Sequence, residues 1–241
     1  MSLSKNQLKL ITSLQQKKYR IKSKLFIAEG TKVVDELLNS NFELEQLFCV
    51  DDSSYKSIEN RCLISDAELK KISTLKTPNN IFALFKIPSE KSIKNEGLIL
   101  ALDGINDPGN LGTIIRLCDW FGVDQLICST NTVDCYNSKV VQASMGSLTR
   151  VSIVYTNLVD YLQNSNLPKY ASLMDGENVY KSNLLKNAIL VMGNEANGIS
   201  TSILNLLSKT ISIPRFGEEQ TESLNVAAAT AILLSEFKRS T

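Results

Sequence analysis

Short apolar runs alternate with segments of helical periodicity from Gly97 to the end of the chain. The first run, Leu98 to Leu102, is continuously apolar, which is typical of a strand buried on both faces of a sheet. The alternation predicts an α/β fold with a mostly parallel sheet. Later strands are expected within QLICST, RVSIVY, YASLMDG, AILVMGN and TISIP, and all of them except YASLMDG precede a helical segment.

The chain before Pro88 predicts a second, smaller α/β unit. Its expected elements are a basic helix over residues 5–23, strands over 24–30, 44–50, 62–65 and 81–87, and helices over 31–40 and 66–74. A polar segment that begins at Pro88 and ends at Gly97 separates the two units. We therefore predict a small domain over residues 1–88, a linker over 89–97 and a larger domain over 98–241.

Composition excludes several classes of site. The chain has no histidine, which rules out Ser-His-Asp and Cys-His catalysis and most zinc and haem sites. Its five cysteines are scattered without a CxxC pair, so neither a disulfide framework nor a metal site is expected. No apolar run reaches the ~20 residues of a membrane span, and the N-terminus lacks the apolar region of a signal peptide. We expect a cytoplasmic protein without a metal or a membrane span.

The first 24 residues carry seven basic side chains and no acidic one. Such a block can neutralise the backbone phosphates of RNA. A solvated helix face has the same composition, and the residues alone do not choose between the two. The predicted RNA-binding residues are Lys17, Lys18, Arg20, Lys22 and Lys24.

Three polar loops follow predicted strands of the larger domain. The first starts at Asp103, the second contains Gly193-Asn194-Glu195, and the third starts at Pro214 and ends where Ser223-Leu224-Asn225 opens an alanine-rich helix. Ligands of α/β sheets bind in the crevice beyond the carboxyl ends of the strands, so these loops are a candidate site. Gly and Asn also serve ordinary strand–helix turns, which is the alternative.

The first loop does not have the pattern of a nucleotide-cofactor fold. Its glycines match neither G-x-G-x-x-G nor a phosphate-binding P-loop. It offers instead Asn110, at the start of a helix expected from Leu111 to Phe121, and Arg116, six residues later. An arginine at this place either forms a structural ion pair or grips a phosphate or carboxylate with its planar fork.

Taken together, the three loops resemble, in the same order, the three signature motifs of the SpoU (TrmH) family of RNA ribose 2′-O-methyltransferases, in the SPOUT superfamily. The matching stretches are DPGNLGTIIRLCDWFG, LVMGNEANGIS and ISIPRFGEEQTESLNVAAATAILLSEF. The N-terminal part is similar to the ribosomal-protein-like substrate-binding domain of that family, through residues 26–30, residues 31–38 and the stretch KTPNNIFALFKIP. The resemblance covers almost the whole chain.

The resemblance implies a trefoil-knotted α/β domain, a homodimer whose active site draws on both subunits, and S-adenosylmethionine bound in the knot. It implies a catalytic set made of Asn110 and Arg116 in the first motif, Glu195 in the second, and Ser223 and Asn225 in the third. It also implies that the backbone of Gly193, Ile213 and Leu224 holds the adenosine part of the cofactor.

The implied reaction is attack of a ribose 2′-OH on the sulfonium methyl group. A guanidinium stays protonated in proteins, so we expect Arg116 to hold the target phosphate and to stabilise the emerging alkoxide. The expected substrate is ribosomal RNA, at a guanosine. The alternatives are a transfer-RNA ribose methyltransferase, a base methyltransferase on a similar knotted fold, and an RNA-binding module that lacks the chemistry.

Overall fold

A computed structural model describes residues 3–51, 53–89, 92–123, 125–217 and 223–239. The chain divides into two compact units. The first unit combines Met1–Ser89 with Asp134–Thr149, and the second combines Glu90–Val133 with Arg150–Thr241. The linker predicted over 89–97 includes residues 90 and 91, which lie outside the described residues.

The second unit contains a six-stranded sheet in which every strand is parallel to its neighbours, so the predicted α/β class with a mostly parallel sheet is confirmed. The order across the sheet is β10-β8-β9-β5-β6-β7. The bounds are β5 (Leu98–Leu102), β6 (Gln125–Ser129), β7 (Ser152–Thr156), β8 (Lys169–Asn178), β9 (Ala188–Met192) and β10 (Lys209–Ser212).

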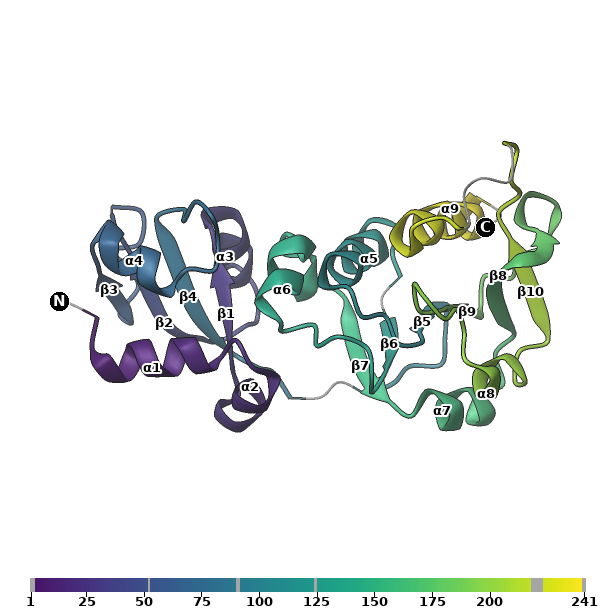
Figure 1. The fold of residues 1–241 in the computed structure, drawn as a ribbon, viewed down its shortest axis with the longest axis horizontal. Coiled ribbons are helices and arrows are strands. Elements are labelled where there is room, and N and C mark those ends of the chain that lie inside the picture. The colour runs from purple at the N-terminus through teal and green to yellow at the C-terminus, as the bar shows by residue number, and fades with distance from the viewer. Residues whose placement is uncertain (1–2, 52, 90–91, 124, 218–222, 240–241) are drawn as a thin grey trace. The chain divides into compact units, whose positions relative to one another are not determined.

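Helices lie on both faces of this sheet, as Figure 1 shows. One face carries α5 (Pro108–Trp120) and α9 (Val226–Arg239), which contact each other. The other face carries α7 (Leu158–Asn164) and α8 (Thr201–Leu204). There the core joins Ile99 and Ala101 of β5 to Leu162 and Ile203 of the two helices. Because both faces are covered, the central strands are apolar throughout, which is why their sequences show no alternation.

The first unit contains a four-stranded mixed sheet in the order β1-β4-β2-β3. Its strands are β1 (Leu25–Glu29), β2 (Leu44–Cys49), β3 (Arg61–Leu63) and β4 (Ile81–Lys86), and its helices before residue 89 are α1 (Lys5–Ser13), α2 (Lys17–Ser23), α3 (Thr31–Leu38) and α4 (Asp66–Ile72). Ile11 of α1 and Leu69 of α4 pack on Ile27 and Phe82 of the sheet. Capping boxes begin both α1 and α4: Ser4 with Gln7, and Ser65 with Glu68.

A segment from the middle of the chain completes the first unit. This segment, 134–149, contains α6 (Ser138–Ser144), which packs on β1. The ring of Tyr136 lies 4.9 Å from that of Phe26, centroid to centroid. Arg20 donates from Nη2 to Oδ2 of Asp134 at 2.6 Å and from Nη1 to two carbonyls of the turn between α1 and α2. The fold of this unit therefore depends on residues more than 100 positions apart in the sequence.

Two predicted elements differ from the structure. The single basic helix expected over residues 5–23 is two helices, because the chain turns between Ser13 and Lys17. The helix expected from Leu111 begins at Pro108, because the carboxylate of Asp107 accepts from the backbone N–H of Asn110 and caps the helix one turn earlier. Within the described ranges, no helix is long and apolar enough to cross a membrane.

Candidate active site

The three polar loops of the second unit leave the carboxyl ends of β5, β9 and β10. After β5 the chain adds β6 and β7 on one side of the sheet, and it later adds β9, β8 and β10 on the other. The loops after β5 and β9 therefore flank the point where the strand order reverses. This is where open parallel sheets bind their ligands.

Asn110 connects all three loops through its side chain. Its Nδ2 donates to Oε1 of Glu195 at 3.0 Å, and its Oδ1 accepts from Nδ2 of Asn225 at 2.9 Å. The half-buried amide lies in the first turn of α5, where the Asp107 cap fixes the backbone. The structure thus joins three of the five predicted catalytic residues in one hydrogen-bonded chain.

Glu195 lies at the tip of the second loop, which is tied to the first loop at two points. Asn194 donates from Nδ2 to the carbonyl of Gly104 at 2.6 Å, and the N–H of Ser200 donates to Oδ2 of Asp103 at 2.7 Å. The loop closes on itself, because Asn194 and Gly198 exchange two backbone hydrogen bonds at 2.9 Å. These ties hold the carboxylate of Glu195 beside Asn110.

Gly193 allows this loop to close. A Cβ built at Gly193 would lie 2.3 Å from the backbone carbon of Gly198 and from the backbone nitrogen of Ile199. No side chain fits at that distance, so the close approach of the two backbone segments requires glycine.

Asn225 fixes the third loop at the start of α9. Its Oδ1 accepts from the N–H of Ala227 at 2.9 Å and of Ala228 at 3.2 Å, which makes it the N-terminal cap of the helix. The cap consumes Oδ1 and leaves Nδ2 to donate to Asn110. One side chain therefore both starts α9 and positions the first loop.

Arg116 and Ser223 are exposed and are not joined to this chain. Neither forms an ion pair or a hydrogen bond with another described residue, apart from the backbone bonds of α5 in the case of Arg116. Of the two roles that the sequence left open for Arg116, the structural ion pair is thus not seen within the described ranges. The guanidinium remains available to an anionic ligand.

The predicted RNA-binding residues lie in the first unit and divide into two kinds. Lys17, Lys18, Lys22 and Lys24 are exposed. Arg20 is 3% exposed, and Asp134 and backbone carbonyls occupy its guanidinium, so its predicted place in the RNA-binding set is corrected to a structural one. The sequence could not reveal this, because Asp134 lies 114 residues further on.

Three further residues position the loops and were not among the predicted site residues. Asn194 and Asp103 hold the second loop, and the N–H of Asn106 donates to Oε2 of Glu195 at 3.4 Å. Their signal was present, since each lies within four residues of the end of a predicted strand. Among the described residues, no group of three or more Cys, Asp or Glu side chains could hold a metal ion.

Known proteins resemble both units of the chain. Residues 97–235 match the SpoU rRNA Methylase family, and residues 5–83 match the MRM3-like substrate binding domain. The two matches define a methylase with a substrate-binding domain before it. The chain belongs to the SpoU rRNA methylase family.

Relatives resemble the chain over nearly its full length. The 23S rRNA (guanosine(2553)-2′-O)-methyltransferase RlmP of Bacillus subtilis is 32% identical over 233 residues, which are 93% of each chain. A putative RNA methyltransferase of the TrmH family from Porphyromonas gingivalis is 38% identical, has a TM-score of 0.88 and covers 99% of both chains. An AdoMet-bound rRNA methyltransferase from Sinorhizobium meliloti is 27% identical, with a TM-score of 0.87, over 99% of this chain and 97% of that one.

Proposed function

We propose that the three-loop site transfers a methyl group from S-adenosylmethionine to a ribose 2′-OH of ribosomal RNA. The observation that carries the proposal is the hydrogen-bonded chain Glu195–Asn110–Asn225, which joins the three motif loops at the carboxyl edge of the parallel sheet. S-adenosylmethionine, when bound, supplies an activated methyl group. The task left to the protein is to align a weakly acidic hydroxyl with that group and to stabilise the charge that develops on its oxygen.

The residues fit the adenosine part of this cofactor. The backbone of Gly193, Ile213 and Leu224 forms no hydrogen bond with another described residue, although Gly193 and Ile213 are half-buried at the ends of β9 and β10. Free backbone donors and acceptors beside apolar side chains suit the polar edge and the flat faces of an adenine. The unbonded backbone groups at the ends of β9 and β10 therefore support the assignment of these residues to the adenosine part of the cofactor.

Arg116 is the group that binds the target strand. Its guanidinium is exposed and has no partner within the described ranges. It grips a phosphate next to the reacting ribose and favours the alkoxide form of the attacking oxygen, while phosphate or water takes the proton. Asn110 and Glu195 orient the ribose. Ser223 lies two residues before Asn225, which caps α9.

The substrate we favour is a guanosine of 23S rRNA, because the relative RlmP, which carries that substrate in its name, aligns over 93% of both chains. Such a substrate places the reaction in the cytoplasm. We retain the predicted domains 1–88 and 98–241 as substrate-binding and catalytic parts, supported by the two family matches, although residues 134–149 of the second domain pack in the first unit. The trefoil knot is retained on the family resemblance.

A homodimer is also part of this proposal. Trp120 is 84% exposed at the end of α5, and α5 contacts α9, so we take this ring as the candidate contact surface of the dimer. Light scattering of the purified chain tests it: a dimeric mass that Trp120→Glu converts to a monomeric one supports the dimer, and a monomeric wild-type mass contradicts it.

The decisive experiment maps 2′-O-methyl groups in total RNA with and without the protein. Because 2′-O-methylation blocks cleavage at the modified position, each modified site appears as a gap in a digestion ladder. We expect one gap in 23S rRNA that depends on this chain. A gap in transfer RNA selects the transfer-RNA alternative, a methylated base selects the base methyltransferase, and unchanged methylation together with RNA binding selects a module without chemistry.

A further inference from the structure

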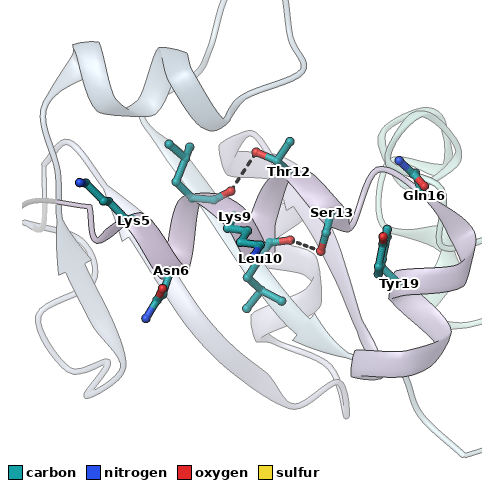
Figure 2. Close-up of a pocket in the computed structure, with 9 residues that line it drawn as sticks. Lys5, Asn6, Lys9, Leu10, Thr12, Ser13, Gln16 and Tyr19 are labelled. Atoms are coloured by element: carbon teal, nitrogen blue, oxygen red, sulfur yellow. Dashed lines mark hydrogen bonds between the residues drawn. The ribbon is translucent and has the colours of Figure 1, made fainter.

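A groove on the first unit runs along α1 to the start of α2, and Lys5, Lys9 and Tyr19 are among the residues that line it (Figure 2). Its side chains lie within residues 5–83, which match the substrate-binding domain. Contacts of this groove with RNA are therefore part of the function already proposed. A separate cluster of buried polar side chains lies in the second unit, at the loop that follows β6.

The loop after β6 begins with a turn that carries two buried hydroxyl groups. Ser129 is 6% exposed and Thr132 is 2% exposed. The N–H of Thr132 donates to the carbonyl of Ser129 at 3.0 Å, so the turn brings the two side chains together. Their hydroxyl oxygens lie 2.9 Å apart. Because buried hydroxyl groups need hydrogen-bond partners, their other contacts show which part of the unit this turn holds.

The two hydroxyl groups bind the end of β5 and the start of the first motif loop. Oγ of Ser129 accepts from the N–H of Gly104 at 2.8 Å. Oγ1 of Thr132 donates to the carbonyl of Leu102 at 3.3 Å. A hydroxyl group has one proton, so Ser129 is the donor in the bond between the two side chains. One directed series of hydrogen bonds thus runs from the N–H of Gly104 to the carbonyl of Leu102.

Backbone contacts reinforce the attachment of the two loops. The N–H of Val133 donates to the carbonyl of Ile105 at 2.8 Å. The hydroxyl group of Tyr155, on β7, donates to the carbonyl of Val133 at 2.6 Å. The loop after β6 is therefore fixed to the neighbouring strand on one side and to the first motif loop on the other.

Gly104 connects this loop to the second motif loop. Its φ of +71° lies in the left-handed region that favours glycine. Its N–H donates to Ser129, and its carbonyl accepts from Nδ2 of Asn194 at 2.6 Å. Oδ1 of Asn194 in turn accepts from the N–H of Ala196 at 2.9 Å, which fixes the turn that carries Glu195. The position of the Gly104 peptide therefore sets the position of this turn.

We propose that Ser129 and Thr132 are positioning residues of the methyl-transfer site. They act through Gly104 and Asn194 on the loop that carries the carboxylate of Glu195. The inference rests on the proposed function for the reaction that this carboxylate serves. It adds a fourth loop, the one after β6, to the three motif loops.

Hydrogen exchange of two glycine amides tests the contacts in the full-length protein. The sequence has one Asn-Gly pair, at Gly198, and two Asp-Gly pairs, at Gly104 and Gly176. Labelling the carbonyl carbon of Asn or Asp and the nitrogen of glycine therefore isolates these signals. The substitution Asp175→Glu, of an exposed side chain, removes the signal of Gly176 from the Asp-Gly spectrum.

Ser129→Ala removes the acceptor of the Gly104 N–H. Exchange at Gly104 and at Gly198 is expected to accelerate roughly 3- to 10-fold, the equivalent of one hydrogen bond. Acceleration at Gly198, in the second motif loop, would support transmission through Asn194. Unchanged exchange at Gly104 would overturn the contact, and unchanged exchange at Gly198 would overturn its effect on the second loop.

Thr230→Val is the matched control for Thr132→Val. The hydroxyl group of Thr230 is fully buried, and it donates to the carbonyl of Val226 at 2.7 Å, so its bond stays within α9. Only Thr132→Val is expected to accelerate exchange at Gly104. Thr132→Ser keeps the hydroxyl group and is expected to exchange like the wild type. Equal exchange for the two valine variants would overturn the role of Thr132.

Single-turnover methylation of a 23S rRNA transcript tests the consequence for the reaction. At saturating RNA and S-adenosylmethionine, Ser129→Ala is expected to be roughly 10- to 100-fold slower, because a displacement of about 1 Å at the reacting groups costs this order. Asn194→Ala breaks the next bond of the same path. The double variant should therefore be at most about 2-fold slower than the slower single variant. Rate losses that multiply in the double variant would overturn the path through Gly104.

Exchange and methylation together separate this inference from the proposed function. A wild-type chain that never methylates, although Ser129→Ala accelerates exchange at Gly198, overturns the proposed function and supports the positioning of the loop. A wild-type chain that methylates, while Ser129→Ala equals it in rate and in exchange, overturns the positioning role alone.

Discussion

The side-chain nitrogen of Asn110 lies 3.0 Å from the Oε1 atom of Glu195. This contact sets the orientation of the amide, because a carboxylate can only accept from the nitrogen. The amide oxygen then faces the opposite way, where Nδ2 of Asn225 donates to it at 2.9 Å. The carboxylate of Glu195, the amide of Asn110 and the helix-capping amide of Asn225 thus form a hydrogen-bonded chain, and the donors and acceptors allow only one orientation of the Asn110 amide.

Asn110→Asp is expected to place a second carboxylate directly against Glu195. Like charges at this distance raise the pKa of the carboxyl groups, so at neutral pH the pair repels and the first two loops separate. As the pH falls, one proton is shared and the contact is restored. The methyl-transfer rate of the variant relative to wild type should therefore rise from pH 8 to pH 5.5, measured in single turnovers.

Asn110→Ala is the matched control for this pH dependence. It removes both hydrogen bonds without adding a charge, so its rate should be lowered by a constant factor across the same pH range. A ratio for Asn110→Asp that does not change with pH would contradict the proposed geometry.

Arg116→Lys is expected to slow methyl transfer by at least ~100-fold, the loss typical of one positioned transition-state donor. The variant keeps the charge but loses the planar fork, so RNA should bind nearly as tightly. Arg116 is exposed without a partner among the described residues, so the melting temperature should stay within error for both Arg116→Lys and Arg116→Ala. A wild-type single-turnover rate for Arg116→Lys would end the catalytic assignment.

Gly193→Ala is expected to disrupt the second loop and the cofactor site. The added carbon would lie 2.3 Å from the backbone of Gly198, which cannot yield as a flexible side chain would. Calorimetric titration should show S-adenosylmethionine affinity lowered at least ~10-fold, in line with the ~1 Å displacement that the overlap demands. Gly217→Ala is the control, since no described atom lies within 4 Å of its Cβ position. Equal affinities for the two variants would refute the role of Gly193.

Arg20→Ala is expected to destabilise the protein by about 3–5 kcal/mol, because it leaves the carboxylate of Asp134 without its partner in a nearly buried place. The side chains of this pair are exposed by only 4% and 13%. Arg150→Ala removes the more exposed pair with Asp119 and should cost at most about 1 kcal/mol. Denaturant unfolding measures the free energy of unfolding of both variants. Similar losses of stability would show that burial does not strengthen the contribution of the Arg20–Asp134 pair.

The sequence predicted the second unit well, because each central strand is a continuous apolar run between turn residues. Leu98–Leu102 and Ala188–Met192 appear in the structure as β5 and β9. The turn between α1 and α2 escaped prediction, because its stability comes from Arg20 donating to two carbonyls of the turn. That contact also needs Asp134, which no local pattern can reveal.

The site was predictable to the extent that it follows strand ends. Asn110, Glu195 and Asn225 were identified through the motif resemblance, and the structure joins them. The resemblance did not reveal which amide faces which carboxylate. Nor did it indicate that Asn194 would hold the second loop through Gly104, because that contact joins two loops 90 residues apart. Long-range hydrogen bonds of this kind depend on register and loop closure rather than on composition.

The discontinuity of the first unit has a consequence for its synthesis. A ribosome releases the four strands of that unit well before it reaches the segment 134–149, which supplies the partner of Arg20 and the ring against Phe26. Until residue 149 has emerged, the nascent unit therefore lacks the carboxylate that pairs with Arg20 and the aromatic ring that covers Phe26. A fragment that stops at Ser89 would stay permanently in that incomplete condition, so a truncated substrate-binding unit needs the later segment fused back to it before its RNA affinity can be measured.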